Sequence, residues 1–147
     1  MNAELGQLNL LLAWLWMLFG FLSGMALGMF FHREEWLGGY ASLRRRMYRL
    51  GHISFFALGA VNLLFWLTAK NISAPGASLT WPSLTFALGA VTMPVCCGLM
   101  AHLPKTRMLF AIPIVSLITG AVLTLGLVAR NGGSRLINHQ PSTISSP

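Results

Sequence analysis

The sequence predicts an all-α integral membrane protein, an antiparallel bundle of four transmembrane helices, and three observations support this fold class. Hydrophobic residues make up 55% of the 147 residues and charged residues only 9%, whereas a soluble domain has about 25% charged residues. Four long uncharged runs are separated by short segments that hold most of the charges. Each run is close to the length of about 20 apolar residues that a helix needs to cross a bilayer.

Charged and proline residues that interrupt the apolar runs set the boundaries of the predicted spans. All four predicted spans belong to one domain, which covers residues 1–130. The four spans cover residues 8–31, 51–69, 82–103 and 108–129. The N-terminus carries Glu4 but no Lys or Arg, unlike a cleavable signal peptide, so the first run is expected to be a permanent span. The polar segment 131–147 is expected to be a disordered tail, because it has few apolar residues to bury.

Small residues and prolines indicate how the spans pack. Gly20, Gly24 and Gly28 stand four residues apart in the first span, and small residues at this spacing let another helix approach closely within lipid. Pro94 and Pro113 lie inside the third and fourth runs. Both are expected to kink their helices, because proline removes a backbone hydrogen bond and clashes with the preceding turn.

The position of the positive charges predicts the orientation. Five of the ten basic residues fall in the first loop or beside it, namely Arg33, Arg44, Arg45, Arg46 and Arg49. An excess of Arg and Lys marks cytoplasmic loops, so the first and third loops are expected in the cytoplasm and both termini outside. The compact chain and its Arg-rich loop fit a bacterial inner (plasma) membrane. The net charge of +7 therefore marks a membrane topology and does not indicate a nucleic-acid partner.

The first loop has a pattern of its own. Between Glu34 and Leu50, apolar residues recur at helical spacing with arginines between them, which is typical of a helix lying in the membrane interface. The alternative is helical turns that extend the first or second span. In either case the arginines are expected to contact anionic lipid or a protein partner. They are Arg44, Arg45, Arg46 and Arg49.

Few residues in the spans could carry chemistry. No charged residue lies at the centre of a span, which argues against a proton-coupled transporter, because such proteins use buried ionisable groups. Asn62 is the deepest strong polar group in the spans, and it is expected to form an interhelical hydrogen bond. Glu34 and Glu35 are adjacent, so on a helix they do not share a face. No catalytic constellation or nucleotide-binding motif is visible, and no catalytic residue is predicted.

Three histidines allow a second hypothesis. His32, His52 and His102 lie at the ends of spans that reach the same side of the membrane, and neutral imidazole ligates haem iron, copper and zinc. The alternative is that each histidine simply sits where its helix leaves the membrane. Cys96 and Cys97 are near His102, but adjacent helical residues point about 100° apart.

These observations lead to three functional hypotheses. The first is an accessory, assembly or binding subunit that contacts membrane lipid, a membrane-protein partner or a second copy of itself. The second is a haem- or copper-binding redox or metal-handling protein that uses the three histidines. The third is a small-solute carrier that works as an oligomer and depends on Asn62.

Overall fold

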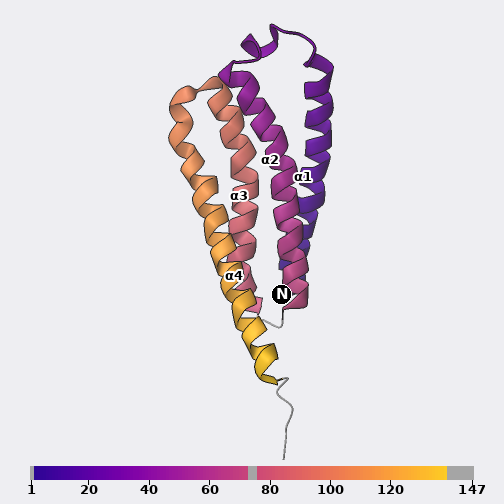
Figure 1. Cartoon of the computed structure of the whole chain (residues 1–147), viewed down its shortest axis with the longest axis vertical. Coiled ribbons are helices and arrows are strands. Elements are labelled where there is room, and N and C mark those ends of the chain that lie inside the picture. The colour runs from indigo at the N-terminus through magenta and orange to yellow at the C-terminus, as the bar shows by residue number, and fades with distance from the viewer. Residues whose placement is uncertain (1, 73–75, 139–147) are drawn as a thin grey trace, which may run out of the picture.

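The computed structural model describes residues 2–72 and 76–138, which form four long helices and no strand (Figure 1). The helices are α1 (Asn2–Phe30), α2 (Leu43–Asn71), α3 (Gly76–His102) and α4 (Ala111–Asn138). All four are long and apolar enough to cross a membrane. The all-α four-helix fold predicted from the sequence is therefore confirmed.

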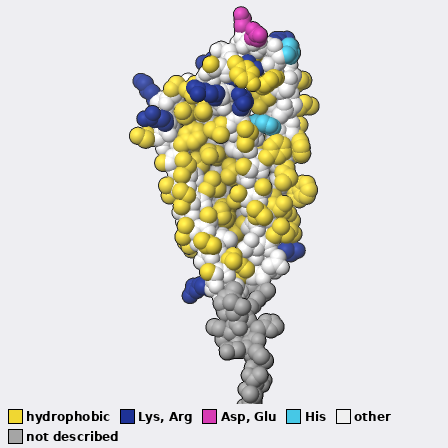
Figure 2. All heavy atoms as spheres, in the orientation of Figure 1, with side chains coloured by type: hydrophobic (Ala, Val, Ile, Leu, Met, Phe, Trp, Pro, Cys, Tyr) yellow, Lys and Arg dark blue, Asp and Glu magenta, His cyan; other side chains and the backbone are white. Residues whose placement is uncertain are grey.

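Consecutive helices run antiparallel and pack side by side (Figure 1). The main contacts join α1 to α2, α2 to α3 and α3 to α4, and a smaller contact joins α1 to α3. The loop between α1 and α2 lies at the same end of the bundle as the connection between α3 and α4. We call this end the basic end, because six of the described cations are exposed there (Figure 2). They are Arg33, Arg44, Arg46, Arg49, Lys105 and Arg107.

A broad apolar surface covers the face of the bundle seen in Figure 2, below the basic end. Large side chains such as Trp14, Phe21 and Leu125 are more than half exposed. Soluble monomers rarely expose a broad continuous apolar surface. Hydrocarbon is the environment that suits it.

The start of α2 corrects one expectation about the first loop. No separate interfacial helix forms over Glu34–Leu50, because α2 begins at Leu43 and continues into the second span. Gly38 and Gly39 have positive φ angles of 86° and 90°, which interrupt any helix before that point. Ser42 then caps α2, with its side-chain oxygen accepting a hydrogen bond from the backbone N–H of Arg45 at 3.2 Å. The arginine-rich segment is thus an extension of the second span, which was the alternative interpretation.

The end of α4 differs from the predicted tail. The helix continues to Asn138, so residues 131–138 are helical where the composition suggested disorder. The rest of that prediction, residues 139–147, lies outside the described part of the chain.

Pro113 occupies the first turn of α4 rather than its middle. Before it, Pro104–Phe110 forms a short 3-10 helix, η2. A proline in the first turn breaks no regular helical bond, so the kink expected at Pro113 is not required. The carbonyl of Leu109, four residues before Pro113, accepts a hydrogen bond from the thiol of Cys96 in α3 at 3.5 Å.

Pro94 lies deep in α3 and has a more consequential effect. It has no N–H to donate to the carbonyl of Ala90, which is buried in the bundle. The indole Nε1–H of Trp16 in α1 donates to this carbonyl at 2.9 Å. Pro94 therefore leaves the Ala90 carbonyl free to accept the hydrogen bond that links α3 to α1.

This bond leads to a testable expectation. Trp16→Phe should lower the free energy of unfolding by about 1 kcal/mol, because it leaves a buried carbonyl without a donor. In a Pro94→Ala background the loss should be smaller, because the alanine N–H can bond to the Ala90 carbonyl instead. Denaturant unfolding of the four proteins in detergent micelles measures both losses, and equal losses in the two backgrounds would contradict the account.

A second buried link lies toward the opposite end of the bundle. Asn9 of α1 donates through Nδ2 to Oδ1 of Asn62 in α2 at 2.8 Å and accepts a hydrogen bond from the hydroxyl of Ser83 in α3. All three residues are buried, and Asn62 donates to the carbonyl of Leu58 at 2.8 Å. Asn62, which was expected to bond between helices, is therefore part of a polar cluster that is centred on Asn9 and joins three helices.

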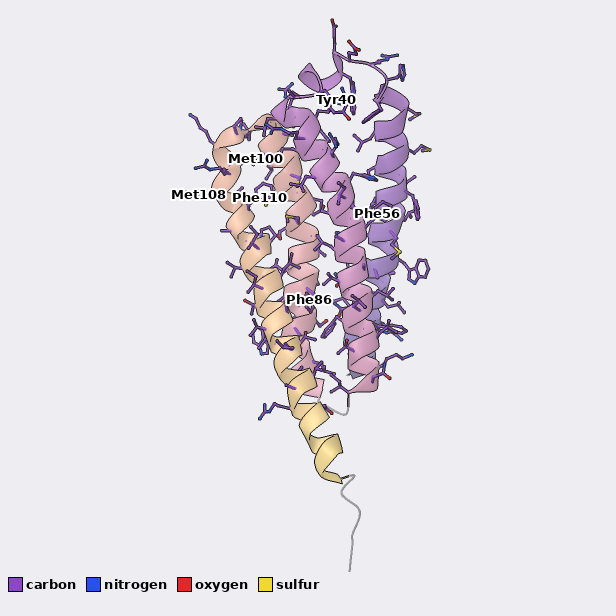
Figure 3. All side chains as sticks on the ribbon, in the orientation of Figure 1. Tyr40, Phe56, Phe86, Met100, Met108 and Phe110 are labelled. Atoms are coloured by element: carbon purple, nitrogen blue, oxygen red, sulfur yellow. The ribbon has the colours of Figure 1, made fainter. Side chains whose placement is uncertain are left out.

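The glycines of α1 do not act together as a ladder. An added Cβ at Gly20 would lie 2.8 Å from the ring of Phe56, which points from α2 toward α1 (Figure 3). One at Gly24 would lie 2.7 Å from the imidazole of His52, but Gly28 faces open space. At Gly59 of α2, by contrast, an added Cβ would meet the backbone of α1, because it would lie 3.1 Å from the carbonyl oxygen of Ala13.

Candidate functional site

A half-open cavity of about 520 Å³ lies at the basic end between α1, α2 and α3. Its volume is within the range of about 300–1,000 Å³ typical of small-molecule sites. Most of its wall is apolar, including Leu27 and Phe30 of α1 and Phe55 of α2. Tyr48 and His52 of α2 also line it. An apolar cavity with a few polar groups is the usual form of a ligand site.

The loop between α1 and α2 contributes Trp36 and Leu37 to the same cavity. They belong to a short 3-10 helix, η1 (Trp36–Gly38). The ring of Trp36 stacks on Phe30 with 5.5 Å between centroids. Leu37 has φ 57° and ψ 26°, a left-handed conformation that costs a leucine about 1–2 kcal/mol. Its carbonyl accepts a hydrogen bond from the hydroxyl of Ser42 at 2.7 Å, which holds this turn against the strain.

The buried side chain of Arg45 holds the loop between α1 and α2 in place by hydrogen bonds to its backbone. Only 1% of the residue is exposed, and its guanidinium donates to the carbonyls of Phe31 at 2.8 Å and Glu34 at 3.4 Å. The guanidinium carbon lies 4.6 Å from the ring centroid of Tyr40, within cation–π range. Figure 3 places Tyr40 beneath the loop, near the start of α2. Arg45 thus neutralises the carbonyl end of α1.

This placement corrects the expected role of one arginine. Buried inside the loop, Arg45 is not available for the lipid or partner contact expected from the sequence. Arg44, Arg46 and Arg49 remain exposed at the surface. The guanidinium of Arg49 also lies over Tyr40, at 5.6 Å from the ring centroid.

The three histidines do not form a metal site. Among residues 2–72 and 76–138, no three His, Cys, Asp or Glu side chains lie close enough to hold a metal ion. Nδ1 of His52 lies 3.0 Å from the hydroxyl of Ser23 in α1. His102 instead pairs with Tyr48, with 2.9 Å between Nε2 and the phenol oxygen. His32 is exposed in the loop. Each histidine therefore has different surroundings, although all three lie at the basic end.

The two cysteines are buried free thiols with separate surroundings. Cys96 bonds to the Leu109 carbonyl, whereas Cys97 lines the cavity. Their separation around α3 agrees with the helical geometry expected of adjacent residues.

A second groove, of about 560 Å³, lies between α2 and α4 toward the other end. Its polar residues are Thr68 and Thr124, whose hydroxyls donate to carbonyls of their own helices. Phe86, labelled in Figure 3, forms part of its wall. Because no polar group of this groove faces an incoming ligand, it is suited to lipid chains and is a weaker candidate site.

Comparisons with protein-family models, with curated proteins and with solved structures find no match to this chain. Its function must therefore be argued from the residues around the cavity.

Sequence reasoning overlooked several residues of this site. Tyr48 precedes His52 by four residues, so the two share a face of α2, and this spacing was a usable signal. The contribution of Trp36 depends on the left-handed turn at Leu37. Nothing in the local sequence requires a leucine to adopt that conformation.

Proposed function

We propose that this protein is a non-catalytic binding subunit of a membrane, which holds an amphipathic small molecule in the cavity at its basic end. One observation carries the proposal: an apolar cavity of about 520 Å³ has polar side chains from two helices at its wall and a loop held in place beside it. Such a combination matches the general form of small-molecule sites. The proposal makes the protein an accessory factor rather than a transporter or an enzyme.

The charges at the basic end support an orientation for this function. We infer that the basic end faces the cytoplasm of a bacterial cell, because exposed arginines and lysines gather there and positive loops favour that side. Arg44, Arg46 and Arg49 then lie at the level of anionic headgroups. A ligand of the cytoplasmic leaflet could reach the cavity from this level.

Gly98 provides a direct way to test occupancy. It lines the cavity, and a Cβ added there meets no atom within 4 Å. Gly98→Phe should therefore fill the cavity without disturbing helix packing. Gly126→Phe is a matched control, because Gly126 also faces open space but does not line this cavity.

The expected result concerns molecules that co-purify with the protein. After purification in mild detergent, mass spectrometry of an organic extract should find a low-molecular-mass compound with the native protein and with Gly126→Phe. Its amount should fall at least about tenfold in Gly98→Phe, the change that corresponds to about 1.4 kcal/mol of binding free energy. Identical extracts from all three proteins would contradict the proposed function.

A further inference from the structure

The neighbours of His52 favour one tautomer of its imidazole. The hydroxyl of Ser23 donates its proton to the carbonyl of Gly20 at 3.0 Å and lies 3.0 Å from Nδ1 of His52. A serine hydroxyl has a single proton to donate and the Gly20 carbonyl can only accept, so both bonds form together only when Nδ1 carries a proton. Proton positions follow here from the bonding network. In the neutral imidazole, Nε2 is then an acceptor.

This acceptor is unused within the described part of the chain. His52 has no hydrogen bond there except the one to Ser23. Its ring packs edge-on against Phe56, at 5.4 Å between centroids, and beside Gly24. These contacts hold the imidazole in place at the wall of the cavity. Covering a polar atom with an apolar ligand costs free energy unless the ligand supplies a hydrogen-bond partner, so a ligand with a donor would be favoured.

The rest of the wall restricts the shape of that ligand. Phe30, Trp36 and Phe55 supply aromatic rings, and such walls favour planar rings through stacked or edge-on contacts. A phenolic hydroxyl, with a pKa near that of tyrosine (about 10), stays protonated at neutral pH and can donate. An ionised fatty acid has only acceptors, so it does not match Nε2.

We propose that the cavity binds a membrane-soluble hydroquinone, with its phenolic hydroxyl donating to Nε2 of His52 and its ring against the aromatic wall. This inference rests on the proposed function and specifies the class of ligand. It requires the reduced form, because the oxidised quinone carries carbonyl acceptors in place of hydroxyl donors. The cavity should therefore distinguish the two oxidation states by one hydrogen bond.

The test compares three probes on the purified full-length protein by equilibrium dialysis against detergent micelles. They are decylubiquinol, its oxidised form decylubiquinone, and the dimethyl ether of decylubiquinol, which lacks both hydroxyl protons. Gly98→Phe gives the background of partitioning into micelles. Native protein should bind decylubiquinol about tenfold more tightly than either other probe. Equal affinity for the three probes would overturn the inference without any mutation.

Two variants of His52 then assign the preference to one atom. His52→Phe should weaken decylubiquinol binding about tenfold and abolish discrimination among the probes. His52→Gln keeps an acceptor oxygen and should retain the preference. A preference that survives in His52→Phe would overturn the role of Nε2, and so would a haem absorption band in the purified protein, because iron would then use the same lone pair.

Failure of this inference can be told apart from failure of the proposed function. If no hydroquinone binds but Gly98→Phe still loses a co-purifying compound, the ligand class is wrong and the binding function stands. If Gly98→Phe retains every compound found with the native protein, the binding function itself is wrong.

Discussion

Arg45→Gln should lower the free energy of unfolding by about 3 kcal/mol, because it removes charge-assisted hydrogen bonds, each worth about 1.5–3 kcal/mol. The guanidinium donates to the carbonyls of Phe31 and Glu34. Glutamine is shorter and uncharged, so these carbonyls would lose their donor and the aromatic rings around the cation would lose their partner. The loop between α1 and α2 should then become more susceptible to protease cleavage near Gly38 and Gly39.

Thermal unfolding in detergent and limited proteolysis of the loop measure these two effects. Arg46→Gln is the matched control, because Arg46 is the next residue along α2 and is exposed. It should unfold like the native protein and resist proteolysis to the same degree. If the Arg45 and Arg46 variants behave alike, the buried role of Arg45 is refuted.

Gly59→Leu should destabilise the bundle by about 2–3 kcal/mol through overpacking. A Cβ at this position would lie 3.1 Å from the carbonyl oxygen of Ala13 and 3.4 Å from Cβ of Trp16. These atoms belong to the backbone of α1 or lie next to it, so they cannot move aside by a simple side-chain rotation. The two helices would therefore have to separate at this contact between α1 and α2.

Gly28→Leu provides the comparison for this prediction. Gly28 belongs to the same glycine series that the sequence suggested for packing, yet an added Cβ there meets open space. Denaturant unfolding in micelles should give this variant a free energy within about 0.5 kcal/mol of the native protein, as for other uncrowded surface positions. A larger loss in Gly28→Leu than in Gly59→Leu would show that the wrong glycine has been assigned to the contact.

The number and order of the helices could be predicted because lipid imposes a strong constraint on sequence. Each span must satisfy its backbone internally and present apolar side chains, and these demands leave long uncharged runs. The contact partners could not be predicted from the same pattern. Gly24 and Gly28 look equivalent in the sequence, but only Gly24 lies against a side chain of α2.

The polar links show a similar division. Pro94 implied a carbonyl without its helical donor, whereas its partner, Trp16, lies in a helix distant in sequence. Asn9 was overlooked beside the apolar core of the first run, although an amide in such a run has few partners available in lipid. The arginines appeared alike from composition, and burial of Arg45 depends on a loop whose path is set by Leu37, Gly38 and Gly39.

Photo-crosslinking in native membranes tests the binding function most directly. A benzoylphenylalanine in place of Met47 would lie at the wall of the cavity, and one in place of Leu64 would lie on the exposed side of α2. We predict one recurrent small-molecule adduct at position 47 and a mixture of bulk phospholipids at position 64. If position 47 captures the same phospholipid mixture as position 64, the cavity holds ordinary lipid and the proposed binding function is wrong.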